Sequence, residues 1–299
     1  MIRTHFRQFL SHGPSFFPRA ATWIAAFALI GTAHAYNSEP ATNPFISEGY
    51  AAHEAGKTDE ALGAFQKALT ANDKDVAALM GTAMIYAEQE RHSEAFSSFD
   101  TVVRYAPDNV FAWNGRGLAA FNMENFDEAL ASFERATANQ PVNGFFYESL
   151  AWTWMCRGDF VKAAEAAKQA ILMYSRRGEA SSYPLLIAYF SYLESGDFEN
   201  AGRTLDYAVA NRPGGRWPTP VIDYLDGRIL ATDLISYVSN SAEETEAQTY
   251  IGLQLRSEGK HADAARHLEW VSQKGDPRVF EYTLARSLSL QGKVASVHP

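Results

Sequence analysis

The side chains that could do chemistry are few in this sequence, and their spacing does not bring them together. After the first 35 residues the histidines are His53, His92, His261, His267 and His298, and no two form an H-x-x-x-H pair. His261 and His267 are six residues apart, which is about 240° around a helix, so their rings do not converge on one metal ion. The sequence therefore predicts no metal site.

Cys156 is the only cysteine, next to Arg157 in a segment with a helical pattern. A single cysteine cannot form an internal disulfide, and we expect a free buried thiol. A reactive thiolate needs a polarising partner, and no histidine is near it in sequence. The sequence also lacks a G-x-S-x-G motif, a phosphate loop and a dinucleotide fingerprint. We predict that the protein is not an enzyme and needs no cofactor.

Neighbouring carboxylates occur as Asp59-Glu60, Asp127-Glu128 and Glu243-Glu244. Paired carboxylates can act as general acid and base, but each pair here falls where a helix is expected to begin. Negative side chains are favourable in a first turn, because the helix N-terminus carries partial positive charge. These pairs are therefore interpreted as helix-start signals.

The elements that position these residues are indicated by a ladder of small and aromatic side chains. Alanines recur every 34 residues, and each of the first three is followed four residues later by phenylalanine. The members are Ala61, Ala95, Ala129 and Ala163, with Phe65, Phe99 and Phe133, and Pro107 and Pro141 follow the second and third alanines by twelve residues. A small residue lets two helices cross closely, the phenylalanine fills the gap to the next repeat, and the proline ends the second helix.

With Trp113, Gly117, Gly49 and Gly56, the ladder matches much of the pattern W-x2-L-G-x2-Y … A-x3-F … P. The chain thus resembles the tetratricopeptide repeat (TPR) superfamily over about 42–213 and again over 245–274. The resemblance implies an all-α fold, a right-handed superhelical solenoid of about six helix hairpins, one of them interrupted. It also implies a surface that holds another molecule.

The ladder divides the chain after residue 41 into five hairpins over 42–213, with repeats at 42–75, 76–109 and 110–143 and a fourth beginning at Gly144. The next alanine, Ala201, comes 38 residues after Ala163, so four extra residues are expected in the loop around 176–182. Residues 214–244 are predicted as an interrupted repeat, with short helices from Val221 to Leu225 and from about Asp233, and a polar loop at 239–244. A sixth hairpin is expected at 245–274, a closing helix at 278–290 and a tail at 291–299.

The N-terminus has the pattern of a secretory signal peptide. Arginines precede a twelve-residue apolar run, Ala20–Gly31, and Ala33-His34-Ala35 is a small-x-small cleavage site. We expect cleavage after residue 35, leaving Tyr36 first and a polar lead-in at 36–41. An uncleaved anchor is the alternative, although twelve apolar residues are too few to cross about 30 Å of hydrocarbon. The protein is therefore predicted to be exported to the periplasm or cell envelope, without a stable membrane span after cleavage.

The charge of the chain limits its partners. Its 299 residues carry a net charge of −9, and without residues 1–35 there remain 23 basic and 35 acidic residues, a net charge of −12. Phosphate backbones and anionic lipids are bound by clustered Lys and Arg, and no basic stripe is present. The charge argues against nucleic-acid binding.

In TPR arrays the second, fifth, ninth, twelfth and thirteenth positions of each repeat are exposed on the concave face. The register places a stripe of methionine, aromatic and few polar side chains there. The predicted protein-binding residues are Met80, Met84, Phe111, Asn114, Leu118, Phe121, Phe145, Trp152, Met155, Tyr183 and Phe190, with Asn122, Glu148, Leu186 and Glu194 on the same face. We expect this groove to take an apolar or helical peptide segment. The alternative is that these side chains pack internally, under the C-terminal helices or a second copy of the chain.

The C-terminal part carries a further resemblance. Trp217-Pro218-Thr219-Pro220, Glu246–Gly252, Phe280-Glu281-Tyr282 and Ala285-Arg286 are similar to bacterial envelope TPR proteins of the NlpI-like group. That group resembles adaptor lipoproteins that bring cell-wall hydrolases together with their regulators, although this chain lacks a lipid-bearing cysteine. The predicted function is a non-catalytic envelope scaffold. The alternatives are a self-associating homodimeric subunit and an accessory subunit of envelope polysaccharide export.

Overall fold

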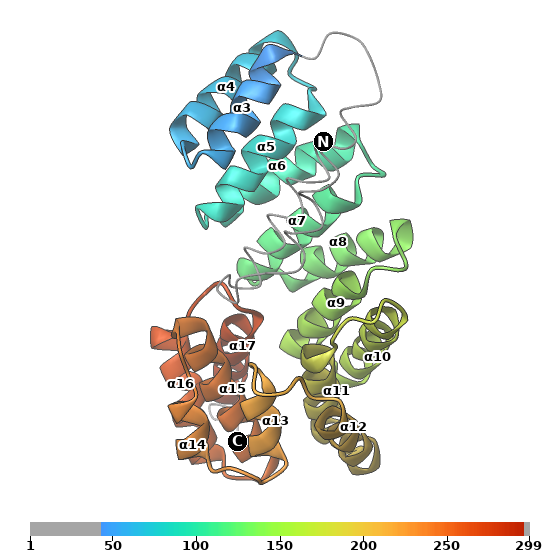
Figure 1. Cartoon of the computed structure of the whole chain (residues 1–299), viewed down its shortest axis with the longest axis vertical. Helices are drawn as coiled ribbons and strands as arrows, with labels where there is room; N and C mark the ends of the chain where they lie inside the picture. Colours follow the sequence, from blue (N-terminus) through green and yellow to red (C-terminus); the bar gives the residue numbers. More distant parts are fainter. Residues whose placement is uncertain (1–42, 296–299) are drawn as a thin grey trace. The chain divides into compact units, whose positions relative to one another are not determined.

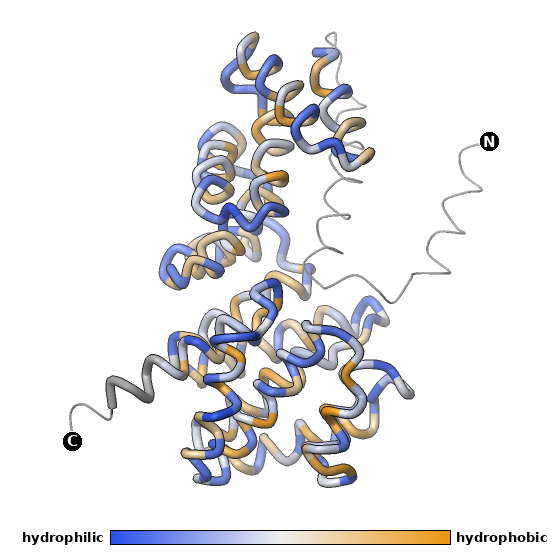
Figure 2. The backbone as a smooth tube through the Cα atoms, turned by 90° about the vertical axis from the view of Figure 1, so that its left-hand side faces the viewer, coloured by the Kyte–Doolittle hydropathy of each residue, from blue (hydrophilic) through white to orange (hydrophobic). Residues whose placement is uncertain are grey.

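A computed structural model describes the backbone of residues 43–295 and the side chains of residues 43–289 (Figure 1). The predicted signal peptide at 1–35, its cleavage before Tyr36 and the lead-in at 36–41 lie outside the described residues. Within residues 43–295 every regular element is a helix, and the predicted all-α repeat solenoid is confirmed. Along these helices hydrophobic and hydrophilic residues alternate (Figure 2), as expected when one face of each helix is buried.

The helices pair into hairpins in chain order. Five hairpins come first: α3 (Pro44–Glu54) with α4 (Thr58–Ala71), α5 (Val76–Glu88) with α6 (His92–Tyr105), α7 (Val110–Asn122) with α8 (Phe126–Asn139), α9 (Gly144–Arg157) with α10 (Phe160–Arg176), and α11 (Ser182–Glu194) with α12 (Phe198–Ala210). Two short helices follow, α13 (Thr219–Leu225) and α14 (Ala231–Ser236). A sixth hairpin, α15 (Ser241–Ser257) with α16 (His261–Lys274), precedes α17 (Phe280–Ala295).

The packing of the ladder explains its period. Ala61 and Phe65 of α4 are fully buried. A Cβ atom built on Gly49 would lie 2.5 Å from Phe65 Cε1, and one built on Gly81 would overlap the same ring. The ring is therefore held between the first helix of its own hairpin and that of the next, which confirms its predicted role of filling the gap to the next repeat.

Short polar side chains cap the N-termini of α5 and α7, the first helices of the second and third hairpins. Asp75 Oδ1 accepts a hydrogen bond from Ala78 N (3.0 Å), and Asn109 Oδ1 accepts from Phe111 N (3.1 Å). Such side chains satisfy amide groups that have no partner inside the helix. Because Asp75 and Asn109 end the first and second repeats in sequence, each of these two repeats supplies the cap of the next hairpin.

Three helix ends differ from the sequence-based expectation. Helix α15 begins at Ser241, inside the predicted polar loop, because Asn240 Oδ1 accepts from Glu243 N (3.0 Å) and acidic residues occupy the first turn. Helix α13 begins at Thr219, since Pro220 is tolerated in a first turn. Helix α17 continues to Ala295, into the segment predicted as a tail.

The C-terminal helices return to the earlier hairpins. Helix α15 packs on α11, and α17 packs on α9 as well as on α15 and α16. Arg256 of α15 forms an ion pair with Glu194 of α11, with 2.9 Å between Nε and Oε1. In Figure 1 the orange and red helices accordingly lie beside α9 and α11.

Candidate functional site

Catalytic groupings are scarce in this fold. Within the described part of the chain, no three His, Cys, Asp or Glu side chains are grouped so that they could hold a metal ion. Cys156 is 1% exposed, and burial raises its pKa well above the usual value. A thiol of this kind is not a nucleophile at neutral pH.

The predicted concave residues lie on the first helices of successive hairpins, α5, α7, α9 and α11. Their expected exposure is wrong for most of them. Phe111, Leu118, Tyr183 and Glu194 are half-buried, and Asn122 is exposed. The others are buried: Met80, Met84, Asn114, Phe121, Phe145, Glu148, Trp152, Met155, Leu186 and Phe190.

Helix α17 accounts for the burial at α7 and α9. The ring of Phe280 lies edge-on to Phe121 (4.9 Å between centroids) and stacks on Trp152 (5.8 Å, interplanar angle 3°). Phe145 is 6.4 Å from the same ring. The middle part of this stripe therefore packs under the C-terminal helices, which is one of the alternatives that the sequence left open.

Helix α15 and the segment before α13 cover the stripe at α11. Phe190 stacks on Tyr250 of α15, with 5.9 Å between ring centroids. Tyr183 donates a hydrogen bond to Glu246 Oε2 (2.9 Å), and Trp217 Nε1 donates to the same oxygen (2.6 Å). The Trp217-Pro218-Thr219-Pro220 segment thus helps to hold α15 against α11.

Two polar atoms on the concave stripe are buried without hydrogen-bond partners among the described residues: Asn114 Oδ1 and Trp152 Nε1. Asn114 and Leu118 occupy the fifth and ninth positions of their repeat and share one face of α7. Met80 and Met84 occupy the same two positions in the preceding repeat. An unsatisfied buried acceptor costs about 1–3 kcal/mol. The stripe therefore contains a buried carboxamide oxygen that has no hydrogen-bond donor among the described residues.

Two residues that sequence reasoning missed stand at the turns of the second and third hairpins. Five residues before each ladder alanine, the other full hairpins have Gly56, Gly158, Gly196 and Gly259, all at positive φ. The second and third hairpins have Glu90 and Glu124 there, both at φ 59°. Non-glycine residues in this region cost about 1–3 kcal/mol. The missing glycines were visible in the aligned repeats and could have marked both positions.

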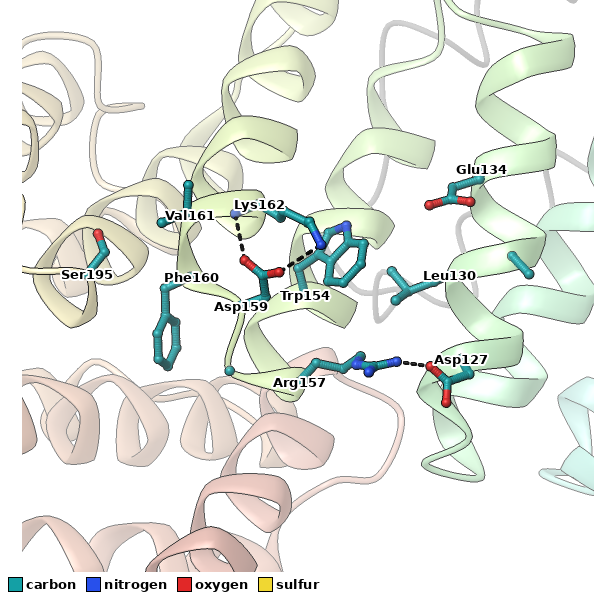
Figure 3. Close-up of a pocket in the computed structure, with 12 residues that line it drawn as sticks. Asp127, Leu130, Glu134, Trp154, Arg157, Asp159, Phe160, Val161, Lys162 and Ser195 are labelled. Carbon is teal, nitrogen blue, oxygen red and sulfur yellow. Dashed lines mark hydrogen bonds and ion pairs between the residues drawn. The ribbon is translucent and has the colours of Figure 1, made fainter.

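A separate hollow of about 830 Å³ lies between α8 and the α9–α10 turn (Figure 3). Trp154 is on its wall, with Lys162 Nζ 4.2 Å from the ring centroid. Lys162 also pairs with Asp159 (2.9 Å), and Arg157 pairs with Asp127. These charges are neutralised within the hollow, and none of its lining residues belongs to the predicted stripe.

Comparison with known protein families supports the repeat fold described above. The model of the tetratricopeptide repeat family matches residues 46–110 and 114–183. A search of curated proteins finds no match. None of the helices between residues 43 and 295 has the length and apolar content that a membrane crossing requires.

Two kinds of solved structure are similar to the chain. One is MamA, with a TM-score of 0.51 and 22% identity over 54% of this chain and 92% of that one. Another is YrrB, described as a TPR protein with an unusual peptide-binding site, with a TM-score of 0.54 and 18% identity over 66% of this chain and 97% of that one. At such identities the likeness shows the fold. The resemblance of the C-terminal part to the NlpI-like group stays a prediction.

Proposed function

We propose that the chain, in which the tetratricopeptide repeat model matches residues 46–110 and 114–183, is a non-catalytic scaffold that binds an apolar, helical peptide segment on its concave stripe. The binding site is centred on α5 and the first turns of α7, at Met80, Met84, Phe111, Asn114 and Leu118. Repeat solenoids present extended surfaces of this kind to other proteins.

The observation that carries the proposal is the Asn114 side chain. It is 1% exposed, and its Oδ1 atom has no hydrogen-bond donor among the described residues. Leaving such an acceptor unpaired in an apolar setting destabilises the free protein, and turning the buried side chain toward a peptide N–H on binding would remove this cost. Asn114 is therefore assigned the polar anchor of the site.

The residues around Asn114 define the chemistry of the ligand. Met80 and Met84 are flexible and polarisable, and so can adapt to different apolar side chains. Phe111 and Leu118 are half-buried on the neighbouring helix. An amphipathic helix with its apolar face towards the stripe fits this composition. The solved structure described as having an unusual peptide-binding site shares this fold, which supports a peptide as the ligand class.

The proposed place of action is the periplasm or cell envelope. It is supported by the apolar run Ala20–Gly31 and the Ala33-His34-Ala35 cleavage pattern. An acidic body also suits a scaffold that binds through apolar contacts. Mass spectrometry of the protein purified from the periplasm tests this, since a chain starting at Tyr36 is expected and a chain retaining residues 1–35 would contradict cleavage.

Peptide selection tests the binding site. Helical peptides selected from a random library on the mature protein should lose about tenfold or more in affinity when Leu118 is changed to Asp, since the bound peptide would bury an unpaired charge at this half-buried position. Val161→Asp is the matched control, because Val161 is 67% exposed on α10. If both variants bind the peptides as the wild type does, the proposed site is wrong.

Self-association is a second candidate function, favoured by one observation on α12. Phe198 is 70% exposed at the start of this helix, and Gly202 lies one turn later on the same face. Gly202, which follows the ladder alanine, has no atom within 4 Å of a built Cβ. Mass measurement in solution separates the candidates, since a monomer at all concentrations would remove the dimer.

A further inference from the structure

Helix α17 contacts the third hairpin through an ion pair between two residues that are far apart in the sequence. Arg286 Nε lies 2.6 Å from Glu124 Oε1, and the two residues are 162 positions apart. Arg286 Nη1 also donates to Tyr282 Oη (3.4 Å). Glu124 is one of the two turn residues that adopt φ 59° where most hairpins have glycine. Its carboxylate therefore gives this turn an interaction that glycine could not make.

The same helix covers the middle of the concave stripe. Phe280 rests on Phe121 and Trp152. Ser287 Oγ donates to the backbone oxygen of Cys156 on α9 (2.6 Å). The cover leaves Trp152 Nε1, 1% exposed as a residue, without an acceptor among the described residues. The aromatic stripe thus holds a donor that α17 buries and does not satisfy.

We propose that α17 is a reversible cover of the concave stripe at Phe121, Phe145 and Trp152, and that the partly exposed Glu124–Arg286 ion pair adds to the apolar contacts that keep it closed. Opening this cover extends the peptide site from the second and third hairpins to the fourth. A longer helical ligand would place an apolar side chain where Phe280 lies and a carbonyl oxygen at Trp152 Nε1. The proposal rests on the proposed function for its ligand, but the opening itself is a property of the free protein.

Hydrogen exchange of the α17 backbone amides reports the opening directly. In the mature protein, Arg286→Glu and Glu124→Arg should each raise the exchange rate of these amides on the order of threefold, because an ion pair at a partly exposed site is lost. The double charge exchange should restore the wild-type rate. Equal rates in wild type and both single variants would overturn the proposal.

Two further variants separate opening from general destabilisation. Glu124→Gly removes the ion pair but also the positive-φ strain, so we expect faster hydrogen exchange in α17 with no loss of thermal stability. Gly81→Ala disturbs the first two hairpins, and should leave the exchange rate of α17 under native conditions unchanged. If exchange in α17 rises only in variants that melt at lower temperature, α17 is a fixed part of the core and not a cover. Peptide binding at Asn114 is not measured in either assay, so a failure here is distinguishable from a failure of the proposed function.

Discussion

At the scale of single residues, Asn114 has opposite effects on stability and binding. Replacing it with Leu removes an unpaired buried oxygen at similar volume, so the free energy of unfolding should rise by about 1 kcal/mol. The affinity for selected peptides should fall, because the polar anchor is lost. Denaturant unfolding and fluorescence anisotropy on the same samples measure the two effects. A variant that is less stable and binds normally would show that Asn114 is a structural residue.

His53 gives the first hairpin a dependence on pH. Its Nε2 atom lies 2.6 Å from Glu88 Oε2, and this hydrogen bond raises the pKa of His53 above its usual value of 6.5. A raised pKa in the folded protein means that the stabilisation is complete below about pH 6.5 and is lost as the pH rises through the higher value. His53→Gln should therefore differ most from the wild type at acidic pH. Unfolding measured from about pH 5 to about pH 9 tests this, and a constant difference would contradict it.

The packing of a side chain could be predicted from the sequence where its contacts are local and recur in each repeat. Phe65 and Ala61 have equivalents in successive repeats, so their packing follows from the period. The burial of Phe121 and Trp152 does not, because it depends on Phe280, which has no counterpart in the earlier repeats. Exposure on the concave face was therefore assigned by analogy between repeats, and failed where the repeats differ in their surroundings.

At the scale of elements, two glycines in neighbouring helices should respond oppositely to alanine. Gly81→Ala in α5 forces a methyl group into the Phe65 ring, and overpacking of about 1–3 kcal/mol should exceed the helix-propensity gain of about 1 kcal/mol. Gly63→Ala in α4 meets no atom within 4 Å and should stabilise by about 1 kcal/mol. Thermal unfolding measures both, and the same sign of change in the two variants would contradict this packing.

Helix boundaries could be predicted to within a few residues, and the errors have physical causes. The 239–244 segment was interpreted as a loop from its polarity, although Asn240 and Glu243 form an N-terminal cap. The closing helix is predicted to end at Leu290, shortly before Gly292, whereas α17 continues through this glycine to Ala295, because a single glycine is tolerated within a helix. Polarity alone does not separate a capped first turn from a loop.

At the scale of the whole molecule, the departure from a simple array is the return of α15 and α17 to α11 and α9. The break at 214–220 could be read from its glycines and prolines, but the direction in which the chain continues could not. That direction depends on contacts such as Arg256 with Glu194 and Arg286 with Glu124. Contacts between residues so far apart cannot be predicted from a single sequence. Which part of the concave face the C-terminal helices cover is therefore seen only in the structure.

The most direct test of the central claim is to map where a selected peptide protects the protein. Hydrogen exchange of the mature chain, with and without saturating peptide, should show slower exchange in the first helices α5 and α7, around Met84 and Asn114. Protection should extend to α9 to a greater degree in Arg286→Glu, in which α17 opens more often. Protection confined to α8 and α10, around the hollow that contains Trp154, would contradict a concave peptide site.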